Sequence, residues 1–163
     1  MSSICRSDKH IGGGIYLSAS SYLNKRYLPG TLTVATVVNR SIDIFRNYLD
    51  FSKDVKVRIA PLRGNDNGRC SERGVIELDC RLSWSKALEV LAHELVHAEQ
   101  YHQGRLKHRM SKGRWMHYWK GSSAFGKGTT YQNYRKQPWE IEAWGRQAEL
   151  AEKVCVELEK LYP

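Results

Sequence analysis

The stretch Leu91–Gln100 reads LAHELVHAEQ. It contains two histidines, His93 and His97, and Glu94 directly follows the first. Each helical residue advances about 100° around the axis, so the two imidazoles would lie about 40° apart on one face, with Glu94 at its edge. Such histidines can share a metal ion, and the glutamate can act as a base towards a metal-activated water. The stretch therefore predicts a zinc site, although two histidines alone would more often be solvated in an ordinary helix.

The rest of this segment predicts a helix that is anchored in a hydrophobic core. Ser83 or Ser85 can cap its N-terminus, and Gly104 is a suitable residue for its end. The apolar residues that point away from the histidine face of the helix are Leu88, Leu91, Ala92, Leu95 and Ala98. A rigid helix suits a metal site, because zinc–nitrogen bonds of about 2.0 to 2.1 Å tolerate little movement.

A catalytic zinc ion usually has three protein ligands and an open position for water. The third ligand must therefore come from outside the two-histidine motif. On a continuous helix His102 would lie about 180° from His93 and point away from the metal. His108 and His117 follow the helix and stay candidates, as do the glutamates of the C-terminal segment.

The segment Pro138–Tyr162 predicts a second amphipathic helix, with proline at a favourable first position. On this helix Glu140 lies on the apolar stripe about 40° from Trp144, whereas Glu142 lies about 160° from that tryptophan. A buried carboxylate needs a compensating cation, and zinc is one such cation. An acid in the first turn can also simply complement the helix dipole. The pattern leaves both interpretations of Glu140 open.

The N-terminal half of the chain predicts one helix and two strands. Residues 31–51 space apolar side chains three and four apart, as in an amphipathic helix. Residues 54–62 and 74–80 alternate apolar and polar side chains, as half-buried strands do. We expect the stretch 63–73, which is rich in glycine and asparagine, to be a flexible connector.

The length of 163 residues suits one compact domain of the α+β class. This domain is predicted to span residues 31–163, with a small β-sheet, the metal helix and a C-terminal glutamate-bearing helix. Residues 113–121, GRWMHYWKG, fit a strand with a half-buried face. Residues 1–30 lack apolar periodicity and are interpreted as an N-terminal extension of unknown role.

The composition indicates a cytoplasmic protein. The four cysteines are scattered and form no CxxC pair, so we expect reduced thiols in the core rather than disulfides. The N-terminus lacks the apolar region of a signal peptide, and no apolar run is long enough to cross a bilayer. We therefore expect no association with a membrane.

The chain is strongly basic, with a formal net charge of +9 and a pI near 9.5. Basic residues crowd between the two predicted site helices: Lys107, His108, Arg109, Lys112, Arg114, Lys120, Lys127, Arg135 and Lys136. Such a surface makes nucleic acid a candidate partner. No helix-turn-helix, zinc-finger or RRM signature accompanies it, and a basic surface can also serve solubility or an acidic protein substrate.

These motifs together resemble a known family. HELVH followed by a helix with Glu140-Ile141-Glu142-Ala143 resembles the gluzincin branch of the zincin metallopeptidases. LAHELVHAEQY, WKG at 119–121 and QPWEIEA at 137–143 are similar to small metallopeptidase-like proteins of bacteriophages. The resemblance covers about residues 75–150 and suggests a bacterial or phage-infected host cell.

The resemblance implies a zincin-like fold and a zinc-dependent metallopeptidase that acts on a protein or peptide. It implies that His93, His97 and Glu140 bind zinc, and that Glu94 is the general base. Many gluzincins have Asp or Asn four residues after the glutamate ligand to support a histidine, whereas this chain has Trp144. Another group must therefore support the histidine.

SprT-like proteases are a more distant resemblance. They share the HExxH motif but take their third ligand from a histidine in a downstream loop. In this chain His108 or His117 would fill that role.

The expected reaction is hydrolysis of a peptide bond by a zinc-activated water. Tyr131, Tyr134 or His117 could donate a hydrogen bond to the oxyanion. The strand at 74–80 would pair with an extended substrate, or else belong only to the core. The alternative is a non-catalytic zincin fold that binds nucleic acid or a partner protein around a structural zinc. Glu94 favours catalysis, because a structural site needs no base.

Overall fold

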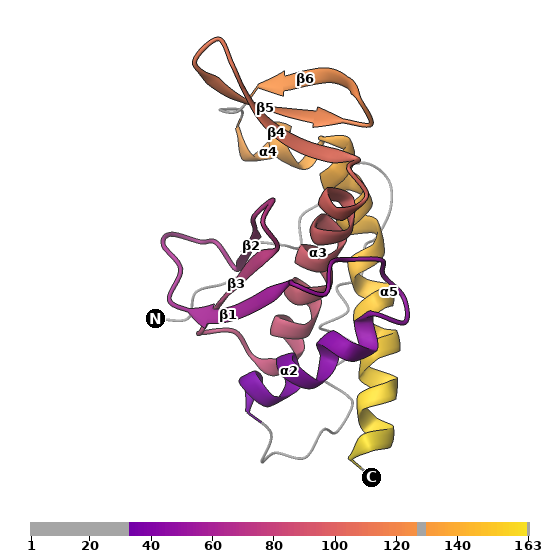
Figure 1. The fold of residues 1–163 in the computed structure, drawn as a ribbon. Coiled ribbons are helices and arrows are strands. Elements are labelled where there is room, and N and C mark those ends of the chain that lie inside the picture. The colour runs from indigo at the N-terminus through magenta and orange to yellow at the C-terminus, as the bar shows by residue number, and fades with distance from the viewer. Residues whose placement is uncertain (1–32, 127–129, 163) are drawn as a thin grey trace.

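The computed structural model describes residues 33–126 and 130–162, which form an α+β fold as expected (Figure 1). The helices in this part of the chain are α2 (Val34–Phe45), α3 (Trp84–His102), α4 (Tyr131–Arg135) and α5 (Pro138–Leu161). The strands are β1 (Lys56–Ala60), β2 (Gly68–Cys70), β3 (Val75–Asp79), β4 (Leu106–Ser111), β5 (Arg114–Trp119) and β6 (Ser122–Gly126).

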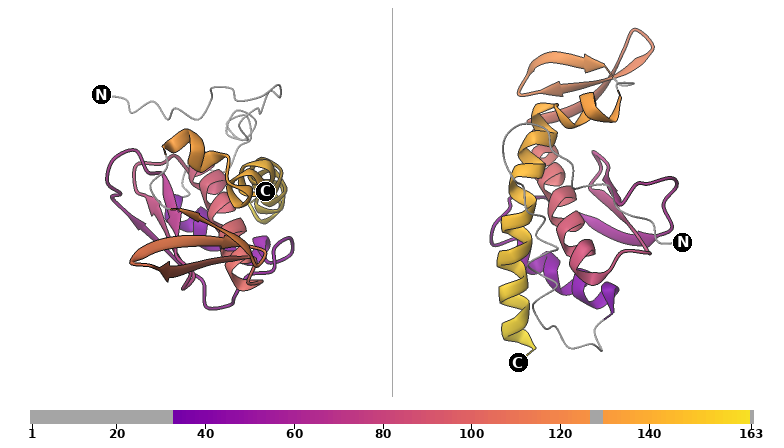
Figure 2. Two further views of the ribbon diagram at one scale, coloured as in Figure 1. Left: turned by 90° about the horizontal axis from the view of Figure 1, so that it is seen from above. Right: turned by 180° about the vertical axis from the view of Figure 1, so that it is seen from behind.

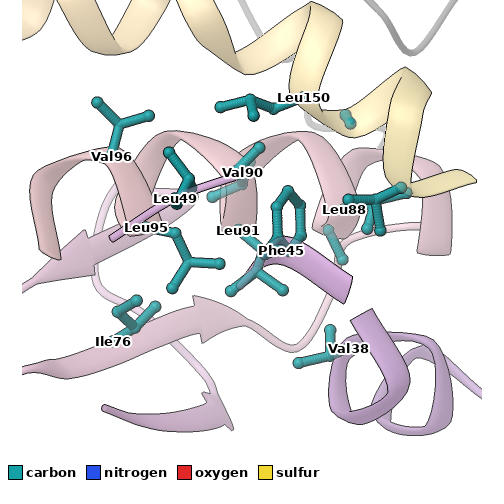
Figure 3. Close-up of a cluster of buried hydrophobic side chains, with 14 of the residues drawn as sticks. Val38, Phe45, Leu49, Ile76, Leu88, Val90, Leu91, Leu95, Val96 and Leu150 are labelled. Atoms are coloured by element: carbon teal, nitrogen blue, oxygen red, sulfur yellow. The ribbon is translucent and has the colours of Figure 1, made fainter. Parts of the chain in front are cut away.

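The helix α3 lies at the centre of the fold. Ser83 caps it, since its hydroxyl accepts from the backbone N–H of Lys86 at 3.4 Å. Gly104 follows the helix in the left-handed region, at φ +67°. The helix packs between α5 on one side and β1–β3 on the other, with α2 across its lower part (Figures 1 and 2). The apolar residues predicted to anchor it are all buried, and Figure 3 shows Leu88, Leu91 and Leu95 in the core.

The first sheet has the strand order β1-β3-β2. The strands β1 and β3 run parallel, and both confirm the prediction of strands at 54–62 and 74–80. The prediction of a connector at 63–73 is wrong in part, because Gly68–Cys70 pairs antiparallel with β3. This pairing covers the second edge of β3, so β3 cannot accept a further strand. The expectation that 74–80 pairs with a substrate is therefore also wrong, and β2 is the edge strand beside α3.

The first described helix, α2, is shorter than the predicted span of residues 31–51. It ends at Phe45, and the chain then turns back. The guanidinium of Arg46 lies 4.4 Å from the centroid of the Phe51 ring and donates to the Phe51 carbonyl at 3.4 Å. Leu49 and Phe51 are both buried. Their apolar spacing therefore reflects tertiary packing of a turn rather than a longer helix.

The second sheet has the order β4-β5-β6 and is antiparallel throughout. It lies beyond the C-terminal end of α3 and the N-terminal end of α5 (Figure 1). Arg114–Trp119 is its middle strand, which confirms a strand within residues 113–121. Its inner face packs on Trp139, which is 2% exposed and stacks on His117 at a ring distance of 5.0 Å.

A cluster of four charged residues joins α3 to α5. Arg146 donates to Glu99 at 2.5 Å and to Glu142 at 3.0 Å. Arg105 donates to Glu142 at 2.6 Å, and its guanidinium lies 3.6 Å from Glu99. Glu99 is only 5% exposed, so its charge depends on these arginines. The cluster therefore fixes the spacing of the two helices.

No helix in residues 33–126 and 130–162 is long and apolar enough to cross a membrane. The predicted extension at residues 1–30 lies outside the described residues. The described cysteines only partly follow the expectation that they belong to the core, because Cys155 is buried, Cys70 is half-buried and Cys80 is exposed. Cys5 lies outside the described residues.

Candidate metal centre

Three side chains from two helices converge on one point. His93 and His97 lie one turn apart on α3, and their Nε2 atoms are 3.1 Å apart. Glu140 lies in the first turn of α5, with its carboxylate oxygens 3.4 Å from His93 Nε2 and 3.2 Å from His97 Nε2. The candidate ligand atoms all lie within 4.8 Å of one another, and this trio could hold a metal ion.

A glutamine on α5 orients the first imidazole. The amide oxygen of Gln147 lies 2.8 Å from His93 Nδ1. The amide nitrogen of Gln147 donates to Glu89 at 2.8 Å, and Glu89 also accepts from Lys86 at 3.2 Å. A carboxylate only accepts hydrogen bonds, so the amide must turn its oxygen towards the histidine. Nδ1 of His93 therefore carries the hydrogen, and Nε2 has the free lone pair.

A second glutamine orients the other imidazole in the same way. The amide oxygen of Gln100 lies 2.9 Å from His97 Nδ1, and its amide nitrogen donates to the carbonyl of Trp139 at 3.0 Å. His97 therefore also has its lone pair on Nε2. The same glutamine ties the first turn of α5 to α3, which sets the position of Glu140 directly after Trp139.

These contacts leave three electron-rich atoms facing one another without a donor between them. Two neutral imidazoles with lone pairs on facing Nε2 atoms cannot hydrogen-bond to each other. Glu140 is 2% exposed, and its Oε1 atom has no hydrogen-bond partner in the described part of the chain. Such a buried oxygen is costly unless a cation or donor compensates it. The donor set of two imidazole nitrogens and a carboxylate oxygen fits zinc.

The electrostatics of the protein show how strongly the site attracts positive charge. Burial opposes ionisation of Glu140, but His93 and His97 hold the pKa of its carboxyl well below the usual range. Burial likewise disfavours a charged His97, yet Glu140 raises the pKa of this imidazole to about 9. Without a metal, a proton would therefore occupy the position between these groups.

Glu94 lies beside the cluster but is not one of its three members. It is 6% exposed, and burial raises the pKa of its carboxyl, while His93 and His97 act in the opposite direction. The strand β2 lies against this side chain. A Cβ atom added at Gly68 would lie 2.5 Å from Val90 Cγ1 and 3.1 Å from Glu94 Oε1. Glycine is therefore required at position 68 for the strand to approach the helix.

The other histidines of the described residues, His102, His108 and His117, lie outside the cluster. His102 is exposed and lies 3.9 Å from Asp50, consistent with its exclusion by helical geometry. His108 Nε2 lies 3.1 Å from the Tyr101 hydroxyl, and its ring packs edge-on against His117 at 4.1 Å. His117 stacks on the ring of Trp139. The structure thus places both alternative third ligands in the second sheet, apart from the trio.

The candidate oxyanion donors take different positions. Tyr131 is 62% exposed on α4, and the ring of His117 is stacked away in the second sheet. Burial and then the Glu140 carboxylate raise the pKa of the Tyr134 hydroxyl. Of the three residues, Tyr134 is the one whose hydroxyl interacts with a candidate ligand.

Sequence reasoning missed three residues near the centre: Gln100, Gln147 and Tyr101. Tyr101 lies one helical turn beyond His97, and burial, Cys70 and Glu94 raise the pKa of its hydroxyl. Spacing could have identified two of them. Tyr101 continues the four-residue step of the histidines, and Gln147 lies seven residues, or two turns, after Glu140. Trp144 does not support a histidine by a hydrogen bond. Its ring packs edge-on against the His93 ring, with the two centroids 4.9 Å apart.

No family model, no curated protein and no solved structure matches this chain.

Proposed function

We propose that the protein is a zinc-dependent metallopeptidase in which His93, His97 and Glu140 bind the metal. The observation that carries the proposal is the meeting of two Nε2 lone pairs and the unpartnered Glu140 oxygen at one point. Both imidazoles are already held in the metal-binding tautomer by glutamine oxygens. A centre built in this way is organised for a cation before the cation arrives.

The donor set supports catalysis better than a structural metal. Structural zinc sites usually have four protein ligands, most often with cysteine among them, whereas catalytic sites have three. The trio here contains no cysteine and leaves a coordination position for water. When bound, zinc supplies a Lewis acid that lowers the pKa of a water and polarises a carbonyl oxygen.

Glu94 is the proposed general base. Burial raises the pKa of its carboxyl, which brings it closer to the range in which a group can accept and return a proton near neutral pH. Glu94 would take a proton from the attacking water and deliver it to the leaving amine. Tyr134 would donate a hydrogen bond to negative charge that develops on the carbonyl oxygen.

The strand β2 is the proposed docking edge for the substrate. Among the described residues it pairs with β3 alone, and Gly68 brings its backbone against Glu94. An extended peptide that adds to this edge would form main-chain hydrogen bonds with β2 and lie beside the base. Strand addition is selective for extended segments, so unfolded or flexible regions of proteins are the substrate class we propose.

The alternative is a non-catalytic zincin fold with a structural zinc that binds nucleic acid or a partner protein. Glu94 distinguishes the two, because a structural centre gains nothing from a buried carboxylate beside its ligands.

The direct test combines metal analysis with a peptidase assay. The purified full-length protein should contain one zinc per chain and cleave an unfolded protein such as reduced casein. A chelator should abolish cleavage, and added zinc should restore it. A protein with one zinc per chain that cleaves neither casein nor a diverse peptide library would favour the non-catalytic alternative. A protein that binds no zinc would refute both.

A further inference from the structure

The net positive charge of the chain comes from one segment. The full sequence has 26 Lys and Arg against 17 Asp and Glu. Nine of the cations lie within residues 100–139, a stretch without a single Asp or Glu, and the rest of the chain balances 17 cations with 17 carboxylates. The whole formal charge of +9 therefore belongs to this segment, which contains the second sheet and α4.

The register of the second sheet divides its side chains between an inner and an outer face. Leu106 faces Trp119 and His108 faces His117 across β4 and β5, so these residues share the inner face that packs on Trp139. The residues between them point to the other side, because side chains alternate along a strand. This outer face, which we define by Lys107, Arg109, Met116 and Tyr118, is basic.

The outer face alternates cations with a flat ring. Lys107 lies directly across from Tyr118 in the register, and the guanidinium of Arg109 is 5.9 Å from the centroid of the Tyr118 ring. Lys107 and Arg109 are exposed. Neither forms an ion pair with any residue in the described part of the chain, whereas nearby Arg105 is held by Glu142. Their charge is therefore available to a partner.

Both turns of the second sheet add a lysine in an unfavourable conformation. Each turn has two residues, Lys112-Gly113 and Lys120-Gly121, and all four have positive φ. Lys112 is at φ +47° and Lys120 at φ +50°, where asparagine or glycine is strongly preferred. The turn geometry does not explain two lysines, because asparagine would fit both positions better. Their shared property is an exposed positive charge at the two ends of β5. The ammonium of Lys120 lies 5.4 Å from the centroid of the Trp119 ring, which belongs to the inner face.

We propose that the outer face of the second sheet, with Lys112 and Lys120 at its ends, binds single-stranded nucleic acid. The exposed cations would attract the phosphates, and an unpaired base would stack on Tyr118 between Lys107 and Arg109. The combination of cations and a ring distinguishes this partner from an acidic peptide, which has no base to stack. A membrane fits less well, because the exposed large apolar side chains of this sheet are Met110 and Trp115 alone among its described residues. The inference does not depend on peptidase activity.

The test is a titration of a fluorescein-labelled 20-nucleotide oligo-dT with the metal-loaded full-length protein, followed by anisotropy at several salt concentrations. Single strands give a slope of about −0.7 per phosphate contact in a plot of log K against log salt. Contacts from Lys107, Arg109, Lys112 and Lys120 should therefore give a slope of about −3. A slope near zero, or no saturable binding at low salt, would overturn the proposal.

The decisive variant is Lys112→Asn with Lys120→Asn. Asparagine favours both turns, so the melting temperature should be unchanged or higher. Binding should nevertheless weaken, and the magnitude of the salt slope should decrease by about 1.4 because two phosphate contacts are lost. The control is Lys56→Gln with Arg58→Gln, which removes the same charge from exposed positions on β1. If the control weakens binding as much as the turn variant, only net charge matters and the proposed site is wrong.

A third variant, Tyr118→Leu, removes the ring but no charge. It should weaken binding of oligo-dT about tenfold without changing the salt slope. Competition then tests the class of partner. The competitors are poly-glutamate, phosphatidylserine vesicles and a DNA duplex of the same length. Binding of any of them as tight as that of the single strand would overturn the assignment.

Discussion

Gln147 and His93 are 54 residues apart in the chain and are joined by a hydrogen bond of 2.8 Å. The amide nitrogen of Gln147 donates a second hydrogen bond to the buried Glu89. In the proposed metal centre, the hydrogen bond between Gln147 and His93 would give this imidazole the support that the resemblance led us to expect from an Asp or Asn at position 144. Its donor direction fixes the tautomer of His93, and hence the atom that faces Glu140.

Gln147→Met should weaken zinc binding about 10- to 100-fold, because methionine keeps the volume but removes the acceptor for His93 Nδ1. Competition with a chromophoric chelator measures this change. Gln132→Met makes the same substitution at an exposed position on α4 and should bind zinc as tightly as the original protein. Equal zinc affinity in both variants would show that the amide does not support the metal centre.

Glu94→Gln should retain one zinc per chain and lose peptidase activity by about 10²- to 10⁴-fold, the usual contribution of a general base. The amide has nearly the shape of the carboxylate, so the metal content should not change. Metal analysis and a quenched fluorescent peptide give the two measurements. Full cleavage by this variant would remove Glu94 from the mechanism.

Glu140→Gln should reduce zinc affinity by more than any change at Gln147, since an amide replaces the anionic ligand. Loss of zinc should bring loss of cleavage. Glu142→Gln is the matched control, because it removes a carboxylate two residues away that pairs with Arg105 and Arg146 instead. The control should lower stability but keep the zinc. The ligand assignment is wrong if the two variants bind zinc equally well.

Gly68→Ala should destabilise the fold by about 1–3 kcal/mol, because the new methyl group would overlap Val90 Cγ1. Denaturant unfolding measures this change. Adding Val90→Ala removes that overlap, at the cost of a small cavity, but leaves the methyl group against Glu94. The loss of unfolding free energy in the double variant should therefore be smaller than the sum of the losses in the two single variants. Its peptidase activity should still be low. Simple addition of the two losses would show that the strand does not press on the helix at this point.

Acid should destabilise the protein partly through Asp79. This carboxylate is 2% exposed and accepts hydrogen bonds from Arg81 and from the backbone N–H of Leu62, and these contacts hold its pKa well below the usual range. Its contribution is present above the unfolded pKa of about 3.9 and is lost as the pH falls towards the folded value. Asp79→Asn should cost about 1–3 kcal/mol at pH 7. The free energy of unfolding of this variant should also fall less than that of the original protein between pH 5 and pH 2.

The central helix and its two histidines could be predicted from sequence because both depend on local spacing. The same holds for the strands β1 and β3, although not for their parallel pairing. What failed depended on tertiary contacts. The end of α2 follows from the packing of Arg46 on Phe51, and β2 is too short and polar to show a strand pattern. Gln100 and Gln147 carry no motif, because an amide becomes a support only when a histidine lies opposite.

The four-residue charge cluster of Glu99, Arg105, Glu142 and Arg146 has a consequence for how metal exchange takes place. It links α3 to α5 separately from the metal trio, so the two helices have a second tether that needs no ion. Removing the metal would then leave the three ligand side chains in place, with a proton between Glu140 and His97. The metal-free protein would therefore stay folded, and zinc would rebind to a preformed site without refolding of the chain.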